Sequence, residues 1–194
     1  MWEGGIGRPA CANNAGGCGV IYEMTPNGDG SWTYHVVHRF ASFPGDGEFP
    51  SGGLALDAAG NFYGTTSEGG SHGSGTVFKL SVSGGKRKIA QLYDFPNCTL
   101  GCYPDGTLAL DQQGNLYGMA EGGANSCSGL SCGVVFKLAQ TNGRYKYSVL
   151  ANFSESTGGV QPFYGVVLDG KGDLFGVTSS FGKYGGGTAF EITP

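Results

Sequence analysis

Six cysteines carry the most distinctive chemistry in this sequence. They form three close pairs along the chain: Cys11 and Cys18, Cys98 and Cys102, Cys127 and Cys132. Such short separations favour three local disulfides, each of which would stabilise the fold by about 2 to 3 kcal/mol through loop closure. The alternative is a zinc site, but the pairs belong to different loops and lack the C-x2-C spacing that directs two thiolates to one ion. Three disulfides would place the protein in an oxidising compartment, extracellular or at the cell surface.

Three aspartates occupy equivalent places in a repeated D-x-x-G pattern: Asp57, Asp111 and Asp169. A ring of carboxylates could bind calcium, but the further oxygen ligands of an EF-hand at defined offsets are missing. Each aspartate lies between apolar runs, where its side chain can accept backbone N–H bonds and open a turn that the glycine closes. We therefore predict a structural role for these carboxylates and no metal site.

The sequence contains none of the G-x-S-x-G, H-E-x-x-H or P-loop patterns. His35 and His38 are three residues apart on an expected strand, so they should point to opposite faces and cannot share a metal. Glycoside hydrolysis needs only two carboxylates, and Glu68 with Asp105 is one such combination. We expect a non-catalytic protein without a cofactor, and a hydrolase or lyase is the alternative.

Seven residues in glycine-rich loops combine aromatic rings, carboxylates and an imidazole, which together suit a sugar or peptide surface. They are Glu68, His72, Glu121, Asp105, Tyr103, Tyr164 and Tyr184. Loop tips are polar in any β protein, but binding residues are concentrated on loops that a rigid scaffold positions. The sequence therefore predicts a ligand surface on these loops, with a glycan or an extracellular protein as the partner.

The scaffold behind these loops is a repeat. Leu54–Thr66 reads L-A-L-D-A-A-G-N-F-Y-G-T-T, and related stretches begin at Leu108 and Val166. Apolar alternation on both sides of the D-x-x-G turn predicts a hairpin, with its first strand over Leu54–Asp57. A second hairpin is expected after each one, for example with strands over 75–80 and 88–95. One unit therefore contains four short strands.

The period of the repeat indicates the architecture. The three turn aspartates are 54 and 58 residues apart, and the whole chain offers thirteen expected strands. Four-stranded units of this length, joined by turns, are typical of β-propeller blades. We predict an all-β partial β-propeller of antiparallel four-stranded blades, short of a closed ring because the smallest common propeller has four full blades. It would be one array over 1–194, divided into 1–43, 44–95, 96–153 and 154–194.

A series of motifs connects these strands: P-x-x-G-L-A-L-D-x-x-G-N-x-Y-G-T-T, then E-G-G, then G-T-V-F-K-L. This series resembles the GloVer tandem repeat, a family of secreted or surface-anchored bacterial proteins, over essentially the whole chain. The resemblance implies a place outside the cell, and it does not point to any enzymatic activity because the function of the family is undefined. The third hairpin departs from it, with Asp173-Leu174-Phe175 for N-x-Y and Ser180-Phe181-Gly182 for E-G-G.

Composition and charge exclude other classes. Charged residues make up 13% of the chain, and the net charge is −4, whereas a nucleic-acid-binding protein should show a basic surface. No apolar run approaches the roughly 18 residues of a membrane span. The leading interpretation is a non-catalytic extracellular binding or adhesion module, and a propeller-type hydrolase or lyase and a structural spacer are the alternatives. Open strand edges would favour self-association or contact with further blades of a longer chain.

Overall fold

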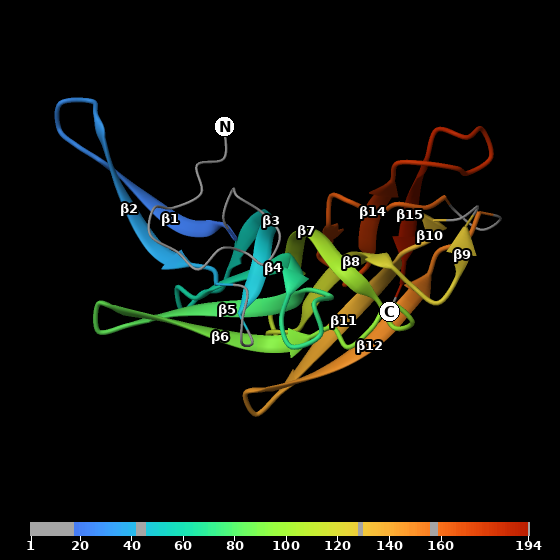
Figure 1. The fold of residues 1–194 in the computed structure, drawn as a ribbon. Helices are drawn as coiled ribbons and strands as arrows, with labels where there is room; N and C mark the ends of the chain where they lie inside the picture. The colour runs from blue at the N-terminus through green and yellow to red at the C-terminus, as the bar shows by residue number, and fades with distance from the viewer. Residues whose placement is uncertain (1–17, 42–45, 128–129, 156–158, 194) are drawn as a thin grey trace.

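The computed structural model of the chain describes residues 18–41, 46–127, 130–155 and 159–193. Every helix or strand element in these ranges is a β-strand. The all-β class predicted from the repeat is therefore confirmed. Figure 1 shows that the strands are grouped into successive sheets.

Four antiparallel sheets follow one another in chain order. The first contains β1 (Val20–Pro26) and β2 (Trp32–Arg39). The second contains β3 (Gly47–Leu56), β4 (Phe62–Gly69), β5 (Thr76–Ser83) and β6 (Lys86–Asp94). The third contains β7 (Cys102–Leu110), β8 (Leu116–Gly122), β11 (Val134–Thr141) and β12 (Arg144–Asn152). The last contains β13 (Val166–Leu168), β14 (Leu174–Thr178) and β15 (Thr188–Ile192).

Each sheet is a meander in which consecutive strands pair, so the sheets correspond to the predicted repeat units. One additional hairpin, β9 (Ser126–Cys127) with β10 (Leu130–Ser131), lies between β8 and β11 and was not predicted. The predicted first strand at Leu54–Asp57 is also longer in the structure, because β3 begins at Gly47. Pro50 is tolerated inside β3 because β3 is an edge strand of its sheet.

The turn aspartates have the predicted structural role. Asp57 Oδ1 accepts hydrogen bonds from the backbone N–H groups of Ala59 at 2.9 Å and Asn61 at 2.8 Å. Its Oδ2 accepts bonds from Asn61 Nδ2 at 2.8 Å and from the Tyr63 hydroxyl at 3.0 Å. Gly60 closes the turn with a φ of 82°, which glycine adopts without the strain of a side chain. The same set of bonds surrounds Asp111 in the third sheet.

A β-bulge in β2 changes the predicted position of two histidines. His38 lies opposite Ile21 and His35 lies opposite Glu23, while Val37 between them has no partner in the register. Ile21 and Glu23 are two residues apart on β1 and share a face, so His35 and His38 share that face as well. The prediction that the histidines point to opposite faces is wrong, because the alternation of a strand shifts at a bulge.

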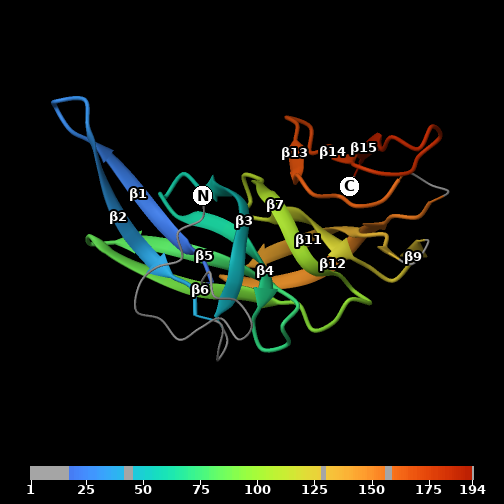
Figure 2. The ribbon, with the colours of Figure 1, turned by 45° about the horizontal axis from the view of Figure 1, so that its top comes forward.

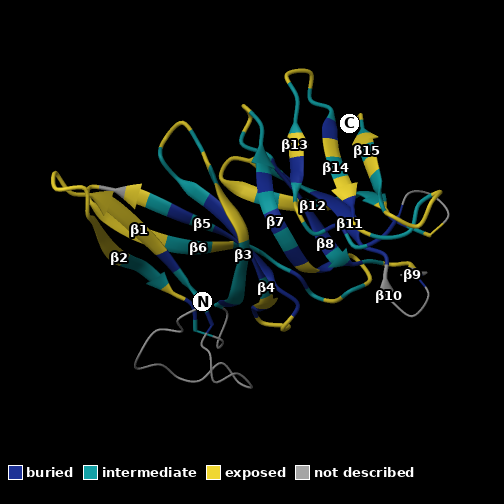
Figure 3. Ribbon diagram, turned by 90° about the horizontal axis from the view of Figure 1, so that it is seen from above, coloured by how far each residue is buried: buried dark blue, intermediate teal, exposed yellow. Residues whose placement is uncertain are grey.

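The sheets pack face to face through three apolar clusters. The cluster between the second and third sheets is centred on Val77, Phe136 and Leu138, all of which are buried. The cluster between the third and last sheets includes Tyr117 and Val135. Figure 3 shows dark blue, buried segments on the inner strands and exposed segments on β1 and β2. The inner strands therefore supply the core of the molecule.

Glycine–proline contacts join each sheet to the next. A Cβ at Gly19 would lie 2.3 Å from the Pro50 ring, and one at Gly133 would lie 2.5 Å from the Pro162 ring. Gly75 packs in the same way on Pro104. Each glycine therefore stands where only a residue without a side chain allows the proline of the following sheet to approach. This contact explains why glycine and proline recur together at the repeat period.

Candidate functional site

One edge of the molecule carries the residues predicted to bind a ligand. In a meander, the start of the first strand, the end of the second, the start of the third and the end of the fourth lie at the same edge. We call the corresponding segments the loop edge: 67–75, 95–105, 120–127, 130–133, 159–165 and 179–187. All seven predicted residues belong to it. Sequence order alone thus placed these seven residues on one edge, while the contacts among them come from the structure.

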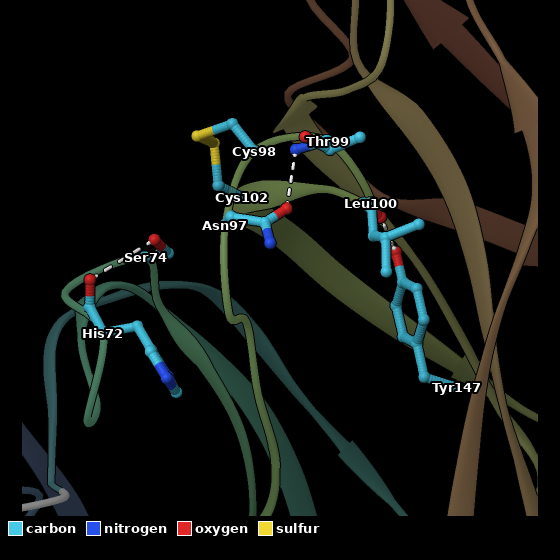
Figure 4. Close-up of a disulfide and its surroundings, with 8 residues drawn as sticks. All are labelled: His72, Ser74, Asn97, Cys98, Thr99, Leu100, Cys102 and Tyr147. Carbon is cyan, nitrogen blue, oxygen red and sulfur yellow. Dashed lines mark hydrogen bonds between the residues drawn. A yellow bond between two sulfur atoms is a disulfide. The ribbon is translucent and has the colours of Figure 1, made fainter.

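Two disulfides constrain the loop edge. Cys98–Cys102 joins residues with a Cα–Cα distance of 4.6 Å (Figure 4), and Cys127–Cys132 spans 5.4 Å. These two predicted pairs are confirmed. Cys18 is also disulfide-bonded, and its predicted partner Cys11 lies outside the described residues.

The Cys98–Cys102 loop is also tied to the neighbouring strand. Figure 4 shows the Tyr147 hydroxyl directed at Leu100, whose carbonyl oxygen accepts its hydrogen bond. Asn97 Oδ1 accepts a bond from the Thr99 N–H at 2.9 Å, which closes a tight turn inside the loop. The connection between the second and third sheets is therefore fixed by its own disulfide and turn and by a hydrogen bond from β12.

Asp105 and Glu121 form a coupled carboxylate pair on neighbouring strands. Burial raises the pKa of Glu121, and the negative charge of Asp105 raises it further. The Asp105 Oδ1 accepts a hydrogen bond from the Gly106 N–H at 2.7 Å. Both side chains are half-buried. The raised pKa of Glu121 is the property that a general acid needs.

Glu68 and Glu121 are not equivalent, although both precede Gly-Gly in the sequence. Pro50 pairs with Thr66, two residues before Glu68, whereas Pro104 pairs with Ala120, one residue before Glu121. Because alternate residues of a strand face opposite sides, the two glutamates point in opposite directions relative to their sheets. The carboxylate that perturbs Glu121 is Asp105, whereas Glu68 lies opposite Glu48. The combination of Glu68 with Asp105 stays a prediction, and the structure adds Asp105 with Glu121 as a second combination.

His72 belongs to a polar cluster that the sequence did not indicate. Its Nδ1 lies 3.5 Å from Asp94 Oδ2, which also accepts a hydrogen bond from the Ser71 N–H at 2.9 Å. Asp94 Oδ1 is buried and has no hydrogen-bond partner among the described residues. Asp94 ends β6, and a lone aspartate at a strand end carries no motif that could have singled it out.

The three predicted tyrosines are exposed to different degrees. Tyr184 is 88% exposed, Tyr164 72% and Tyr103 41%. Tyr103 has a φ of 54°, as does Phe49 at the equivalent position before Pro50. Its N–H donates a hydrogen bond to the carbonyl oxygen of Ser74 at 2.9 Å, so the strained backbone is held by the preceding sheet. This hydrogen bond fixes the backbone of Tyr103 at the loop edge.

A hollow of about 260 Å³ between the first and second sheets was also missed. His38 and Asp46 line it beside Phe40 and Phe78, with His38 Nε2 3.1 Å from Asp46 Oδ2. Asp46 also accepts hydrogen bonds from the backbone N–H groups of Ala41 and Gly47. Asp46 therefore has a structural role, because its hydrogen bonds fix the chain between the first and second sheets.

In the described part of the chain, no group of three or more histidine, cysteine, aspartate or glutamate side chains is arranged to hold a metal ion. No helix long and apolar enough to cross a membrane is found there either.

These features define an all-β tandem-repeat protein with a disulfide-constrained loop edge. The chain belongs to the Gloeobacter/Verrucomicrobia repeat family, whose model matches residues 10–194. This match confirms the resemblance found from the motifs. Neither a curated protein nor a solved structure matches the chain.

Proposed function

We propose that the protein is a non-catalytic extracellular binding module built from β-propeller-type blades. The loop edge would present its ligand surface, and a glycan or an extracellular protein would be the ligand. The observation that carries this proposal is the combination of exposed Tyr164 and Tyr103 with the carboxylates Asp105 and Glu121 on one constrained edge. Aromatic rings offer apolar contact area at a low entropy cost, and carboxylates accept hydrogen bonds from sugar hydroxyls or backbone N–H groups.

The way the sheets meet supports the proposed propeller architecture. The meander sheets pack face to face in chain order, and the segments that carry β3, β7 and β13 approach each other at Gly52, Gly106 and Gly165. A radial arrangement of blades brings first strands together around an axis in this way. The disulfides support a location outside the cell, because the cytosol keeps thiols reduced.

A glycan and protein array tests the binding function directly. Tyr164→Ala should lower the affinity for a retained ligand by roughly tenfold or more, because exposed aromatic anchors carry much of the energy of such interfaces. The matched control is Leu56→Ala, which removes an exposed apolar side chain at the opposite edge. Equal affinity of Tyr164→Ala and the unaltered protein would contradict this surface.

The second candidate function is a hydrolase or lyase that uses the Asp105–Glu121 pair. The raised pKa of Glu121 favours it, since a protonated carboxyl beside an ionised one can act as a general acid. A broad glycosidase and lyase screen with Glu121→Gln separates the two functions, and Glu68→Gln tests the predicted Glu68–Asp105 combination in the same screen. Turnover that disappears in either variant would replace the binding module with an enzyme. Absence of both binding and turnover would leave a structural spacer as the function.

A further inference from the structure

The interfaces inside the molecule are all built from the same two kinds of face. We call the face that a sheet turns toward the following sheet its forward face, and the opposite one its backward face. In the second sheet, Tyr63 and Val77 lie on the forward face, in the cluster shared with the third sheet. Phe78 and Leu80 lie on the backward face, in the cluster shared with the first sheet. Each interface therefore joins one forward face to one backward face.

The first sheet presents a backward face that no described residue covers. Tyr22 and Met24 occupy the positions of Phe78 and Leu80 in the repeat, and Tyr34 occupies that of Ile89. Unlike those counterparts, Tyr22, Met24 and Tyr34 are all exposed. The rings of Tyr22 and Tyr34 lie against each other with centroids 5.3 Å apart. The sheet thus carries apolar residues at interface positions in contact with solvent.

The last sheet presents a forward face that is likewise not covered by any part of the chain that the structure describes. Phe175 occupies the position of the buried Tyr63 and Tyr117, yet it is 40% exposed. Val177 on the same strand and Val167 on β13, which is 70% exposed, extend this apolar face. Figures 1 and 2 show the first and last sheets at opposite ends of the molecule. The described residues of one chain therefore expose both halves of the interface that the chain uses internally.

We propose that the two end faces bind each other between copies of this chain, with the forward face of β13–β15 of one copy on the backward face of β1–β2 of the next. A second copy is the occupant that these observations favour, because the faces are position-by-position counterparts of surfaces that already pack together. Repeat arrays that end in solvent carry polar outer faces, whereas both of these faces are apolar. The proposal does not depend on any ligand at the loop edge.

The charged and aromatic pairs at the inner interfaces specify the expected register. Glu23 on β1 of the first sheet forms an ion pair with Arg87 on β6 of the second sheet. Lys79 occupies the position of Glu23 one unit later, and Tyr145 occupies that of Arg87. Burial raises the pKa of Tyr145, and the positive charge of Lys79 acts against that rise. Glu191 is the counterpart of Glu23 and Lys79, and Trp32 is the counterpart of Arg87 and Tyr145. Glu191 of one copy would therefore meet Trp32 of the next, and Trp32 is 58% exposed. An indole N–H can donate to a carboxylate, so this pair fits the pattern.

Head-to-tail contacts of this kind leave one free face at each end of the assembly. Addition can therefore continue until the rotation closes a ring, or without limit if it does not. A symmetric contact, in which one face binds its own copy, would stop at a dimer. The two possibilities give different results when variants are mixed.

Sedimentation velocity over a concentration series tests the proposal. The unaltered chain should shift from monomer to larger species as its concentration rises. Tyr34→Lys, which blocks the backward face, and Phe175→Lys, which blocks the forward face, should each remain monomeric. Val82→Lys is the control, because it charges an exposed apolar position on β5 of the second sheet, away from the two end faces of the molecule. Far-ultraviolet circular dichroism establishes that each variant keeps the β fold.

Mixing the two blocked variants provides the decisive measurement. Each retains the face that the other lacks, so the mixture should form a dimer and nothing larger. A monomeric unaltered chain at every concentration would overturn the proposal. So would association of Phe175→Lys alone, or a mixture of the two blocked variants that stays monomeric.

Discussion

The hairpin of the third sheet and the hairpin of the last sheet share a turn but differ in the polar network around it. Asp111 accepts bonds from the Asn115 side chain at 2.7 Å and from the Tyr117 hydroxyl at 3.0 Å, in addition to its backbone bonds. Asp169 accepts backbone bonds from Lys171 at 2.8 Å and Asp173 at 2.9 Å. The turn itself therefore needs only an aspartate and the backbone N–H groups that it caps.

The difference follows from what covers each hairpin. Tyr117 is buried between the third and last sheets, so its hydroxyl needs a hydrogen-bond partner. The ammonium of Lys137 lies 5.1 Å from the centre of its ring. In the last sheet these positions hold Phe175 and Glu191, and the face is exposed. The side-chain network thus belongs to the packed interface, and the turn exists without it.

The largest expected effect contrasts the aromatic residues of the third strand in these two sheets. Phe136→Ala should lower the free energy of unfolding by about 3–5 kcal/mol, because the ring is fully buried between two sheets. Phe190→Ala should cost clearly less, because that ring packs against one sheet only and is half-buried. Urea unfolding followed by fluorescence measures both. A loss below about 1 kcal/mol for Phe136→Ala would contradict its core position.

The next effect concerns the loops that close the two sheets. Replacing Cys127 and Cys132 together by alanine should cost about 2 kcal/mol, the loop-closure entropy of a short bridge. The corresponding loop of the last sheet closes without cysteine, through a hydrogen bond from the Gly185 N–H to the Gly182 carbonyl. Addition of a reductant to the unaltered protein should cost more than this, because it also opens Cys98–Cys102, and the double variant should lose correspondingly less on reduction. A double variant as stable as the unaltered protein would show that the bridge is dispensable.

The smallest effect isolates the polar network. Tyr117→Phe should cost about 1 kcal/mol at neutral pH, because it removes the hydroxyl bond to Asp111. Burial acts to raise the pKa of Asp111, but the hydrogen bonds of Asn115 and Tyr117 outweigh it and hold the pKa below the ordinary 3.8. A lowered pKa means that this stabilisation is present above the ordinary pKa and is lost as the pH falls through the lowered value.

The control for this experiment is the reverse change in the last sheet. Phe175→Tyr introduces the hydroxyl at an exposed position and should leave the free energy of unfolding unchanged. The gap between Tyr117→Phe and the unaltered protein should also narrow as the pH falls below the ordinary pKa of Asp111 and through its lowered value. A gap that persists in acid would assign the cost to packing of the ring.

Much of the fold could be predicted, because its signals are local. The D-x-x-G turns, the alternating strands and the short cysteine pairs each depend on neighbours in sequence. The β-bulge at Val37 could not be predicted, because an unpaired residue is defined by the partner strand. The same limit applies to Glu68 and Glu121, which a motif aligns and the register separates. Asp94 likewise became visible as part of a site only through its contact with His72.

By itself, the sequence determined the repeat unit, its four strands, the turn chemistry and the edge on which the candidate binding residues lie. Only the tertiary structure decided which copy of each repeated residue is buried. Tyr22 and Phe78 occupy one position of the repeat, yet Tyr22 is exposed and Phe78 is buried. The physical reason is that a strand pattern specifies the direction of a side chain, whereas burial requires a neighbouring sheet to exclude water from it.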